Sequence, residues 1–273
     1  MFKLIFAVAL LAFGASPAVS QAEGVTSDVH SLPMRFEWRQ EGPADTCGST
    51  CQSWVSAVGV ITGDTPAEFN TFVQGRSTQG AMIVLDSPGG STLSAMSLGG
   101  MIRSLSMTTA VGRTIELPAR DGETPQARLS PDADCESMCA FVLLAGIKRH
   151  VPAEARVRVH GLWLRGRSHD PMAASYSAVE LAIMQRDLGL LAQYTIEMGG
   201  SIELLATAAR VPPWEPLRLL LPDELHRMGL TNSDRLFDSR ALDIANADAT
   251  RLTPIVGGEL KDSSKLDELR LSR

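Results

Sequence analysis

The pattern of apolar and polar positions predicts strands that alternate with helices. Short apolar or alternating runs bounded by glycine, proline or polar residues are typical of strands, and apolar residues recurring every three to four positions are typical of helices. The predicted strands cover 54–62, 81–85, 107–111 and 156–159. The predicted helices cover 65–75, 91–105, 171–197 with a break near Gly189, 201–209 and 222–228. This spacing predicts an α/β fold with a mainly parallel sheet.

A Gly-Gly turn separates the predicted strand 81–85 from the helix that Ser91 caps. Gly89 and Gly90 let a ligand come close to the backbone, and N–H groups before a helix can bind an anion or a developing oxyanion. The same residues also occur in ordinary tight turns. The turn is therefore a candidate site only in combination with other residues.

The candidate chemistry lies between Cys135 and His160. Ser137 begins an apolar, helix-like run, and His160 ends the alternating run 156–159. A serine hydroxyl is a weak nucleophile until a neighbouring base takes its proton, so the pair suggests a nucleophile and its base. The structural alternative is a buried helix followed by a strand whose histidine only binds a loop.

Composition limits the class of protein. The chain has 273 residues, of which 44% are hydrophobic and 21% charged, typical of one globular domain of about 200 residues with short extensions. The net charge of -6 argues against a nucleic-acid partner, because binding phosphates requires clustered lysine and arginine. No pattern in the sequence predicts a cofactor or a metal site.

The first residues predict a secretory signal peptide over 1–22. Lys3 precedes the apolar run 4–13, and Gly14, Pro17 and small residues follow. The run is shorter than the roughly 20 residues that cross a bilayer, so after cleavage no stable membrane span is expected. An uncleaved anchor is the alternative. We expect a periplasmic or secreted protein.

The four cysteines form two Cys-x-x-x-Cys pairs, Cys47 with Cys51 and Cys135 with Cys139. In an exported protein, disulfides are the expected state of these thiols. Three connectivities are possible, and the sequence leaves them open; a zinc site is the alternative. A disulfide at either pair could hold the loop that presents Ser137.

Changes in polarity along the sequence predict where the folded domain begins and ends. We expect a weakly structured lead-in over 23–53 that carries the first cysteine pair, a folded domain over 54–234, and a polar tail over 235–273. Within the domain, 113–134 is rich in proline and polar residues and shows no periodicity, which predicts a long loop.

Several motifs together resemble a known family. They are Leu-Asp-Ser-Pro-Gly-Gly at 85–90, Glu-Ser-Met-Cys-Ala-Phe at 136–141, Val-Arg-Val-His at 157–160, Gly-Gly-Ser-Ile-Glu at 199–203, and Leu-Pro-Asp-Glu-Leu at 221–225. Over 54–232 the chain resembles the proteolytic subunit of Clp-type serine proteases, in the Clp/crotonase superfamily. It is more loosely similar to exported Clp-like proteins of uncharacterised function with a Cys-x-Ser-x-Cys segment. The resemblance implies a repeated ββα core with peripheral helices, and makes 113–134 an insertion.

The resemblance also implies roles for individual residues. Ser137 corresponds to the nucleophile and His160 to its general base, and the backbone N–H groups of Gly90 and Met138 correspond to the oxyanion donors. A Ser/Lys arrangement with Lys148 as the base is the alternative.

The third member of the catalytic triad is missing from the matching position. The family has an aspartate where this chain has Ala208, and losing that carboxylate can lower turnover about 10⁴-fold. Glu136, Asp170 and Glu203 are candidate substitutes. Cys139 replaces a family glycine.

The sequence therefore predicts an exported, ATP-independent serine hydrolase, a peptidase acting on peptides or proteins through a Ser-His pair with an incomplete triad. The alternative is a catalytically silent Clp-like binding or assembly module. Export away from cytoplasmic CoA disfavours acyl-CoA chemistry. Because the family forms rings, the resemblance also implies a homo-oligomer in which the helix 171–197 contacts another subunit.

Overall fold

The computed structural model describes residues 29–42, 51–117, 126–164, 167, 170, 172 and 175–233. The predicted signal peptide at 1–22, Cys47 and the tail at 235–273 lie outside these residues, as do parts of the predicted lead-in.

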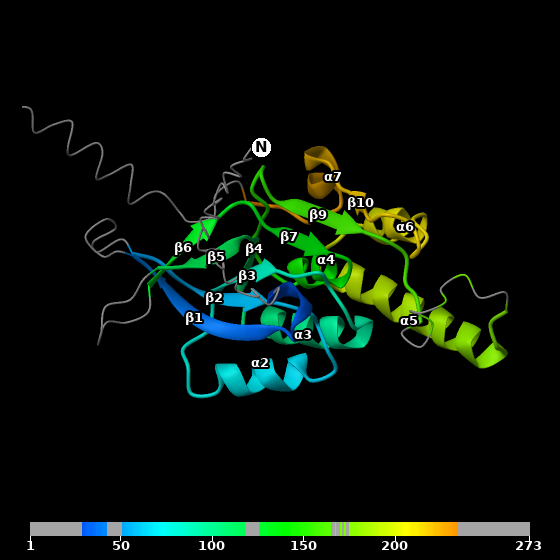
Figure 1. The fold of residues 1–273 in the computed structure, drawn as a ribbon, viewed down its shortest axis with the longest axis horizontal. Helices are drawn as coiled ribbons and strands as arrows, with labels where there is room; N and C mark the ends of the chain where they lie inside the picture. The colour runs from blue at the N-terminus through cyan, green and yellow to red at the C-terminus, as the bar shows by residue number, and fades with distance from the viewer. Residues whose placement is uncertain are drawn as a thin grey trace, which may run out of the picture.

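Two sheets form the centre of the described structure (Figure 1). The larger has the order β5-β6-β1-β2-β3-β4-β8 and the smaller the order β10-β9-β7. The strands of the large sheet are β1 (Arg35–Glu41), β2 (Ser53–Val58), β3 (Met82–Asp86), β4 (Thr108–Val111), β5 (Arg113–Glu116), β6 (Gln126–Ser130) and β8 (Arg149–His150). Those of the small sheet are β7 (Asp134–Glu136), β9 (Arg156–Val159) and β10 (Arg218–Leu219).

Most strand pairs are parallel. Only β1–β2, β5–β6 and β9–β10 are antiparallel among the described pairs. The predicted α/β class with a mainly parallel sheet is confirmed.

The helices follow the predicted pattern with small shifts. They are α2 (Thr65–Val73), α3 (Thr92–Ser104), α4 (Met138–Leu143), α5 (Ala178–Glu197), α6 (Ile202–Ala209) and α7 (Pro222–Arg227), with the 3₁₀ turn η1 (Val29–Ser31). Figure 1 shows α2 and α3 together on one face of the large sheet, and α5 extending beyond the small sheet. None of the described helices is long and apolar enough to cross a membrane.

Helix α5 differs from the prediction at its start and at its centre. It begins at Ala178 rather than near 171, where the Ser177 hydroxyl accepts from the Glu180 N–H and the Glu180 carboxylate accepts from the Ser177 N–H. This reciprocal capping fixes the first turn. The helix continues through Gly189 without the predicted break.

The stretch expected to be a weakly structured lead-in contains strand β1. Phe36 packs against Phe69 and Phe72 of α2, at 4.9 Å and 6.1 Å between ring centroids. The prediction was wrong for 35–41 because charged residues alternate with the aromatic ones there and lower the apolar signal. Residue pairs such as Phe36 with Ala57 join β1 to β2.

The predicted long loop at 113–134 contains strands in its described parts, 113–117 and 126–134, while 118–125 lie outside the described residues. Strands β5 and β6 form an antiparallel pair, β6 continues the sheet beside β1, and β7 begins at Asp134. Here too the charges have partners, since Arg39 of β1 binds Glu116 of β5 at 2.7 Å. The prediction of a loop was wrong because polar residues on an exposed sheet face look like loop residues in sequence.

Helix α4 is buried along its whole length, and two arginines bind the backbone that follows it. Arg103 donates to the Ala145 carbonyl at 2.6 Å and Arg149 to the Leu144 carbonyl at 3.1 Å. Both also donate to the Met198 carbonyl at the end of α5, at 3.0 Å. Burial, together with the nearby charge of Arg103, lowers the pKa of Arg149. Since helix C-termini carry partial negative charge, they are suitable partners for these two cations.

Tyr194 gives α5 a second contact with α4. Its hydroxyl donates to the Phe141 carbonyl at 3.0 Å. The hydroxyl reaches this position past Gly99 of α3, where a Cβ atom would collide with it. Gly100, the next residue of α3, faces open space instead.

Replacing Gly99 by alanine should therefore destabilise the fold by about 1–3 kcal/mol, because the added methyl group overpacks the Tyr194 contact. Gly100→Ala is the matched control, and it should stabilise the helix by about 0.5–1 kcal/mol. Urea unfolding of both variants measures the difference. Tyr194→Phe should partly rescue Gly99→Ala, and equal effects of the two glycine substitutions would contradict the packing described.

Candidate functional site

Ser137 occupies a sharp turn between strand β7 and helix α4. Its φ of 54° and ψ of -121° lie in a region that residues with a side chain rarely adopt. Such a backbone costs about 1–3 kcal/mol and persists only where the surroundings hold it. Here the Ser137 N–H donates to the Arg158 carbonyl of β9 at 2.8 Å, which ties the turn to the strand that precedes His160.

The Gly-Gly turn after β3 packs directly against this serine turn. The Ser87 N–H donates to the Asp134 carbonyl at 2.8 Å, and the Glu136 N–H donates to the Ser87 carbonyl at 2.9 Å. At Gly89, where φ is +87°, a Cβ atom would lie 2.8 Å from both the Ser137 Cβ and the Met138 nitrogen. Glycine is therefore needed at 89 to bring the two segments together.

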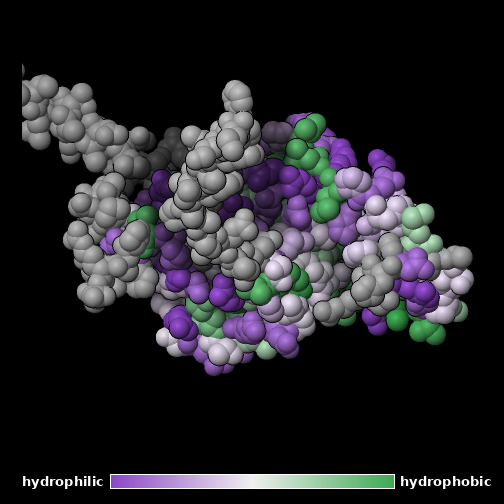
Figure 2. Space-filling view, in the orientation of Figure 1, coloured by the Kyte–Doolittle hydropathy of each residue, from purple (hydrophilic) through white to green (hydrophobic). Residues whose placement is uncertain are grey.

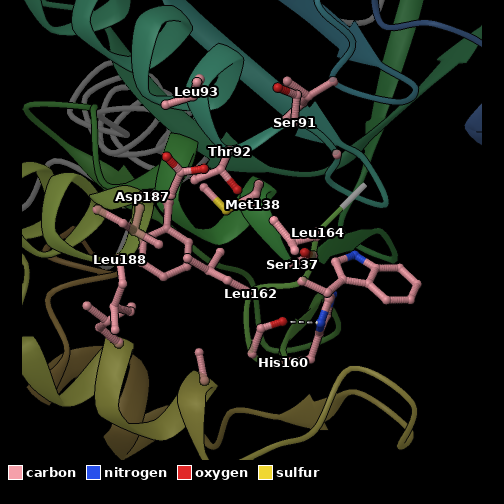
Figure 3. Close-up of a pocket in the computed structure, with 18 of the residues that line it drawn as sticks. Ser91, Thr92, Leu93, Ser137, Met138, His160, Leu162, Leu164, Asp187 and Leu188 are labelled. Carbon is pink, nitrogen blue, oxygen red and sulfur yellow. Dashed lines mark hydrogen bonds between the residues drawn. The ribbon is translucent and has the colours of Figure 1, made fainter. Parts of the chain in front are cut away.

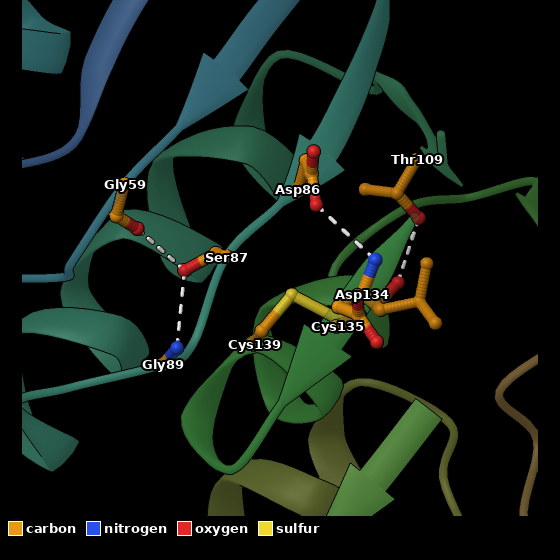
Figure 4. The surroundings of a disulfide bond; sticks show 9 residues. Gly59, Asp86, Ser87, Gly89, Thr109, Asp134, Cys135 and Cys139 are labelled. Carbon is orange, nitrogen blue, oxygen red and sulfur yellow. Dashed lines mark hydrogen bonds between the residues drawn. A yellow bond between two sulfur atoms is a disulfide. The ribbon is translucent and has the colours of Figure 1, made fainter. Parts of the chain in front are cut away.

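A disulfide spans the serine turn. Cys135 at the centre of β7 is bonded to Cys139 in the first turn of α4, with the two Cα atoms 5.2 Å apart (Figure 4). Both residues are buried. Of the connectivities left open by the sequence, this is the pairing within the second motif. Cys51 is also disulfide-bonded, and none of the described cysteines is free, which is consistent with an oxidising environment.

Ser137, Met138, Gly90 and His160 line one cavity of about 440 Å³ (Figure 3). The structure thus brings together the four residues to which the resemblance assigns the nucleophile, the base and the oxyanion donors. The walls are mainly apolar, and include Leu93, Phe141, Leu162, Trp163, Ile183, Leu188, Leu191 and Leu205.

The register of β7 and β9 explains why the serine and the histidine meet. The two strands are parallel, and Glu136 pairs with Arg158. Ser137 therefore directly follows the end of β7, and His160 directly follows the end of β9, two residues after Arg158. Side chains at the carboxyl ends of adjacent parallel strands share one edge of the sheet.

The hydrogen bond of His160 determines which ring nitrogen can act as a base. Its Nδ1 lies 2.8 Å from the carbonyl oxygen of Gly161. Because a carbonyl only accepts, Nδ1 carries the proton and Nε2 keeps its lone pair. Within the described residues Nε2 has no hydrogen-bond partner, and no hydrogen bond joins the ring to the Ser137 hydroxyl. The ring has the tautomer that a general base requires.

None of the three candidate acids binds the His160 ring in the described structure. Glu136 accepts from Arg158 at 2.7 Å, Glu203 from Arg227 at 3.2 Å, and Asp170 is exposed. Ala208 itself lines the cavity. The acceptor for the His160 Nδ1–H is instead the backbone carbonyl of Gly161, which no side-chain pattern could have predicted.

The two expected oxyanion donors lie in suitable backbone. Gly90 has a φ of +143°, and a Cβ there would collide with the Ile61 carbonyl. The Met138 N–H belongs to the first turn of α4, where no intrahelical acceptor exists. Lys148, the alternative base, is exposed and does not line the cavity.

The sequence analysis missed Asp187, a carboxylate from α5 that also lines the cavity. It lies beside Arg186 on a helix whose rotation about its axis depends on tertiary contacts such as Tyr194 with Phe141.

Comparison of the chain with protein-family models finds no matching family, and no curated protein matches it. The resemblance to the Clp family therefore stays an expectation that rests on the sequence motifs.

Burial lowers the pKa of His160 below its ordinary value of 6.5, more than the Gly161 carbonyl and the charge of Glu136 raise it. The ring should thus titrate below pH 6.5 in the folded protein. NMR titration of the His160 ring, assigned with His160→Gln, measures the midpoint.

The same shift makes a stability prediction with a defined sign. Since the folded ring binds its proton less readily than the unfolded one, His160 favours the folded state above about pH 6.5. That contribution should disappear as the pH falls through the lowered pKa. The unfolding free energy of His160→Gln should lack this component, and a folded midpoint at or above 6.5 would contradict the burial effect.

Proposed function

We propose that this chain is an exported, ATP-independent serine hydrolase, and that it acts as a peptidase on peptide or protein substrates. One observation carries the proposal: Ser137, in a positive-φ turn, and His160, whose Nε2 has no hydrogen-bond partner among the described residues, line the same cavity at the ends of neighbouring parallel strands. Maintaining a strained serine next to a histidine of the correct tautomer is useful for acyl transfer and costs stability otherwise.

In the proposed reaction the Ser137 oxygen attacks the substrate carbonyl carbon while Nε2 of His160 takes the hydroxyl proton. The tetrahedral oxyanion forms beside the N–H groups of Gly90 and Met138. The His160 ring then gives its proton to the leaving amine, which departs as the C–N bond breaks. Water repeats the sequence on the acyl-enzyme and releases the acid.

The missing carboxylate affects one part of this cycle more than the other. A triad aspartate both holds the histidine tautomer and stabilises the imidazolium. The Gly161 carbonyl supplies the first function through its 2.8 Å contact, but it is uncharged and supplies less of the second. We therefore propose a slow enzyme whose deficit lies in imidazolium stabilisation.

We assign the fold to the Clp/crotonase type with its repeated ββα core. The α/β class, the mainly parallel sheet and the motif positions around the cavity support this assignment. Export to a periplasmic or secreted location is supported by the first 22 residues and by the disulfides.

A catalytically silent binding module is the second candidate. Within the described residues no carboxylate contacts the His160 ring, and the serine hydroxyl makes no hydrogen bond to it. A protein that had lost its chemistry could keep this cavity as a peptide-binding site.

A fluorophosphonate probe separates the two candidates, because it phosphonylates only an activated serine. We expect labelling of the native protein, none of Ser137→Ala, and labelling of His160→Gln slowed about 10²–10⁴-fold. Intact-protein mass spectrometry gives the rates and the modified residue. Ser97→Ala, an exposed serine on α3, is the control and should label like the native protein. Folded protein that takes up no probe at Ser137 would rule out the hydrolase.

We also propose that the chain forms a homo-oligomer through α5. Several large apolar side chains on this helix are exposed, among them Val179 at 68%, Leu181 at 52% and Ile196 at 63%. Figure 2 shows apolar residues gathered at the end of α5 that extends away from the sheets. Exposed apolar residues in such numbers on one helix favour a protein interface.

Light scattering tests the assembly. The native protein should have a mass several times that of one chain, and Val179→Glu combined with Leu181→Glu should lower it. Leu219→Glu on β10, which is also exposed, is the control and should leave the mass unchanged. A monomer at all protein concentrations would exclude the oligomer.

A further inference from the structure

One carboxylate interrupts the apolar wall of the cavity. Apart from His160, Asp187 is the only residue with an ionisable side chain among the lining residues, all of which belong to the described part of the chain. Its side chain is only 20% exposed. Its neighbours in the wall include Phe141, Leu188 and Leu191.

The Asp187 carboxylate lies on the side of the cavity where Thr92 begins α3 (Figure 3). In Figure 3 the Asp187 carboxylate extends toward Thr92 at the start of α3, whereas Ser137 and His160 lie on the other side of the residues drawn. All four residues line the same cavity. The acid thus lies in the same space as the candidate nucleophile but does not contact it by any hydrogen bond of the described structure.

Arg186 binds only one of the two carboxylate oxygens of Asp187. Arg186 donates to the Oδ1 atom through Nε at 2.9 Å and Nη2 at 2.7 Å. Oδ2 accepts no hydrogen bond from the described residues. Arg186 is 57% exposed and does not line the cavity, and such surface ion pairs contribute little.

A solvated ion pair on the helix surface would explain the contact with Arg186. It does not explain why the carboxylate borders a cavity walled by leucine and phenylalanine, since placing an acid there weakens apolar binding. A ligand with an apolar stem and a cationic end would satisfy both the wall and the acid. The aliphatic part of lysine or arginine packs against apolar surface while its charged end seeks a partner.

We propose that Asp187 makes the cavity selective for a lysine or arginine side chain, whose stem packs on the apolar wall and whose cation binds Oδ2. A cavity of about 440 Å³ has room for such a long side chain. In this environment a charge pair is stronger than in water, because apolar walls lower the local dielectric. The inference names the substrate class of the proposed hydrolase, and so rests on it for its catalytic meaning.

Binding can be tested without catalysis in the Ser137→Ala background. The probes are three acetylated hexapeptide amides that differ at one central position, which holds lysine, N-acetyl-lysine or norleucine. Calorimetry should show the lysine peptide binding about tenfold more tightly than the other two, as expected for one charge-assisted contact. Adding Asp187→Asn should abolish the difference.

Two further variants separate a specific site from general negative charge. Asp223→Asn removes an exposed carboxylate of α7 that binds Arg227, and it should leave the lysine preference intact. Arg186→Gln frees Oδ1 and should strengthen lysine binding or leave it unchanged. Equal binding of all three peptides, or a lysine preference that survives Asp187→Asn, would overturn the inference.

The outcome is independent of the fluorophosphonate result. A lysine preference that depends on Asp187 in a protein without a reactive Ser137 would support the cation site and reject the hydrolase. A reactive Ser137 without that preference would do the reverse. If both hold, ester substrates should show the same Asp187-dependent preference in kcat/KM.

Discussion

The arrangement of the candidate site depends on the positive-φ backbone at Ser137. That conformation is unfavourable by itself, and four features fix it from different sides. The Arg158 carbonyl binds its N–H, the Cys135–Cys139 disulfide spans it, Gly89 packs against it, and the buried helix α4 follows it. Because these contacts come from both sheets, the serine is positioned by the whole central part of the fold rather than by its own loop.

The sequence predicts buried elements well and charged strands poorly. Strands β3 and β4 lie within about one residue of their expected positions because their runs carry no charge before the end of the strand and stop at polar or glycine turns, and β9 is found through its strict alternation of arginine and valine. Strands β1 and β5 are not predicted, because their charged residues are also typical of loops. In the folded chain these charges have partners across the sheet, as Arg39 has in Glu116. Only the pairing of strands shows that these charges belong to a sheet, and one sequence contains no information on that pairing.

The sequence motifs identify only some of the residues that form the candidate site. Ser137 and His160 are recognisable because their chemistry needs particular residue types. The acceptor for the His160 Nδ1–H is a backbone carbonyl, which every residue possesses, so nothing marks Gly161 in the sequence. Asp187 is one of three acidic residues on α5, and only the packing of this helix beside the cavity distinguishes it from the other two.

The paired arginines under α4 have a mechanical consequence. Arg103 and Arg149 each bind the Met198 carbonyl of α5 and the backbone just after α4, and Tyr194 adds a third link between the two helices. The C-terminal end of α5 is therefore bound to α4, the helix that follows Ser137. The N-terminal end of α5 extends away from the sheets and has exposed apolar side chains (Figure 1). Any molecule that packs on the extended end would therefore contact the same helix that contributes Asp187, Leu188 and Leu191 to the cavity wall.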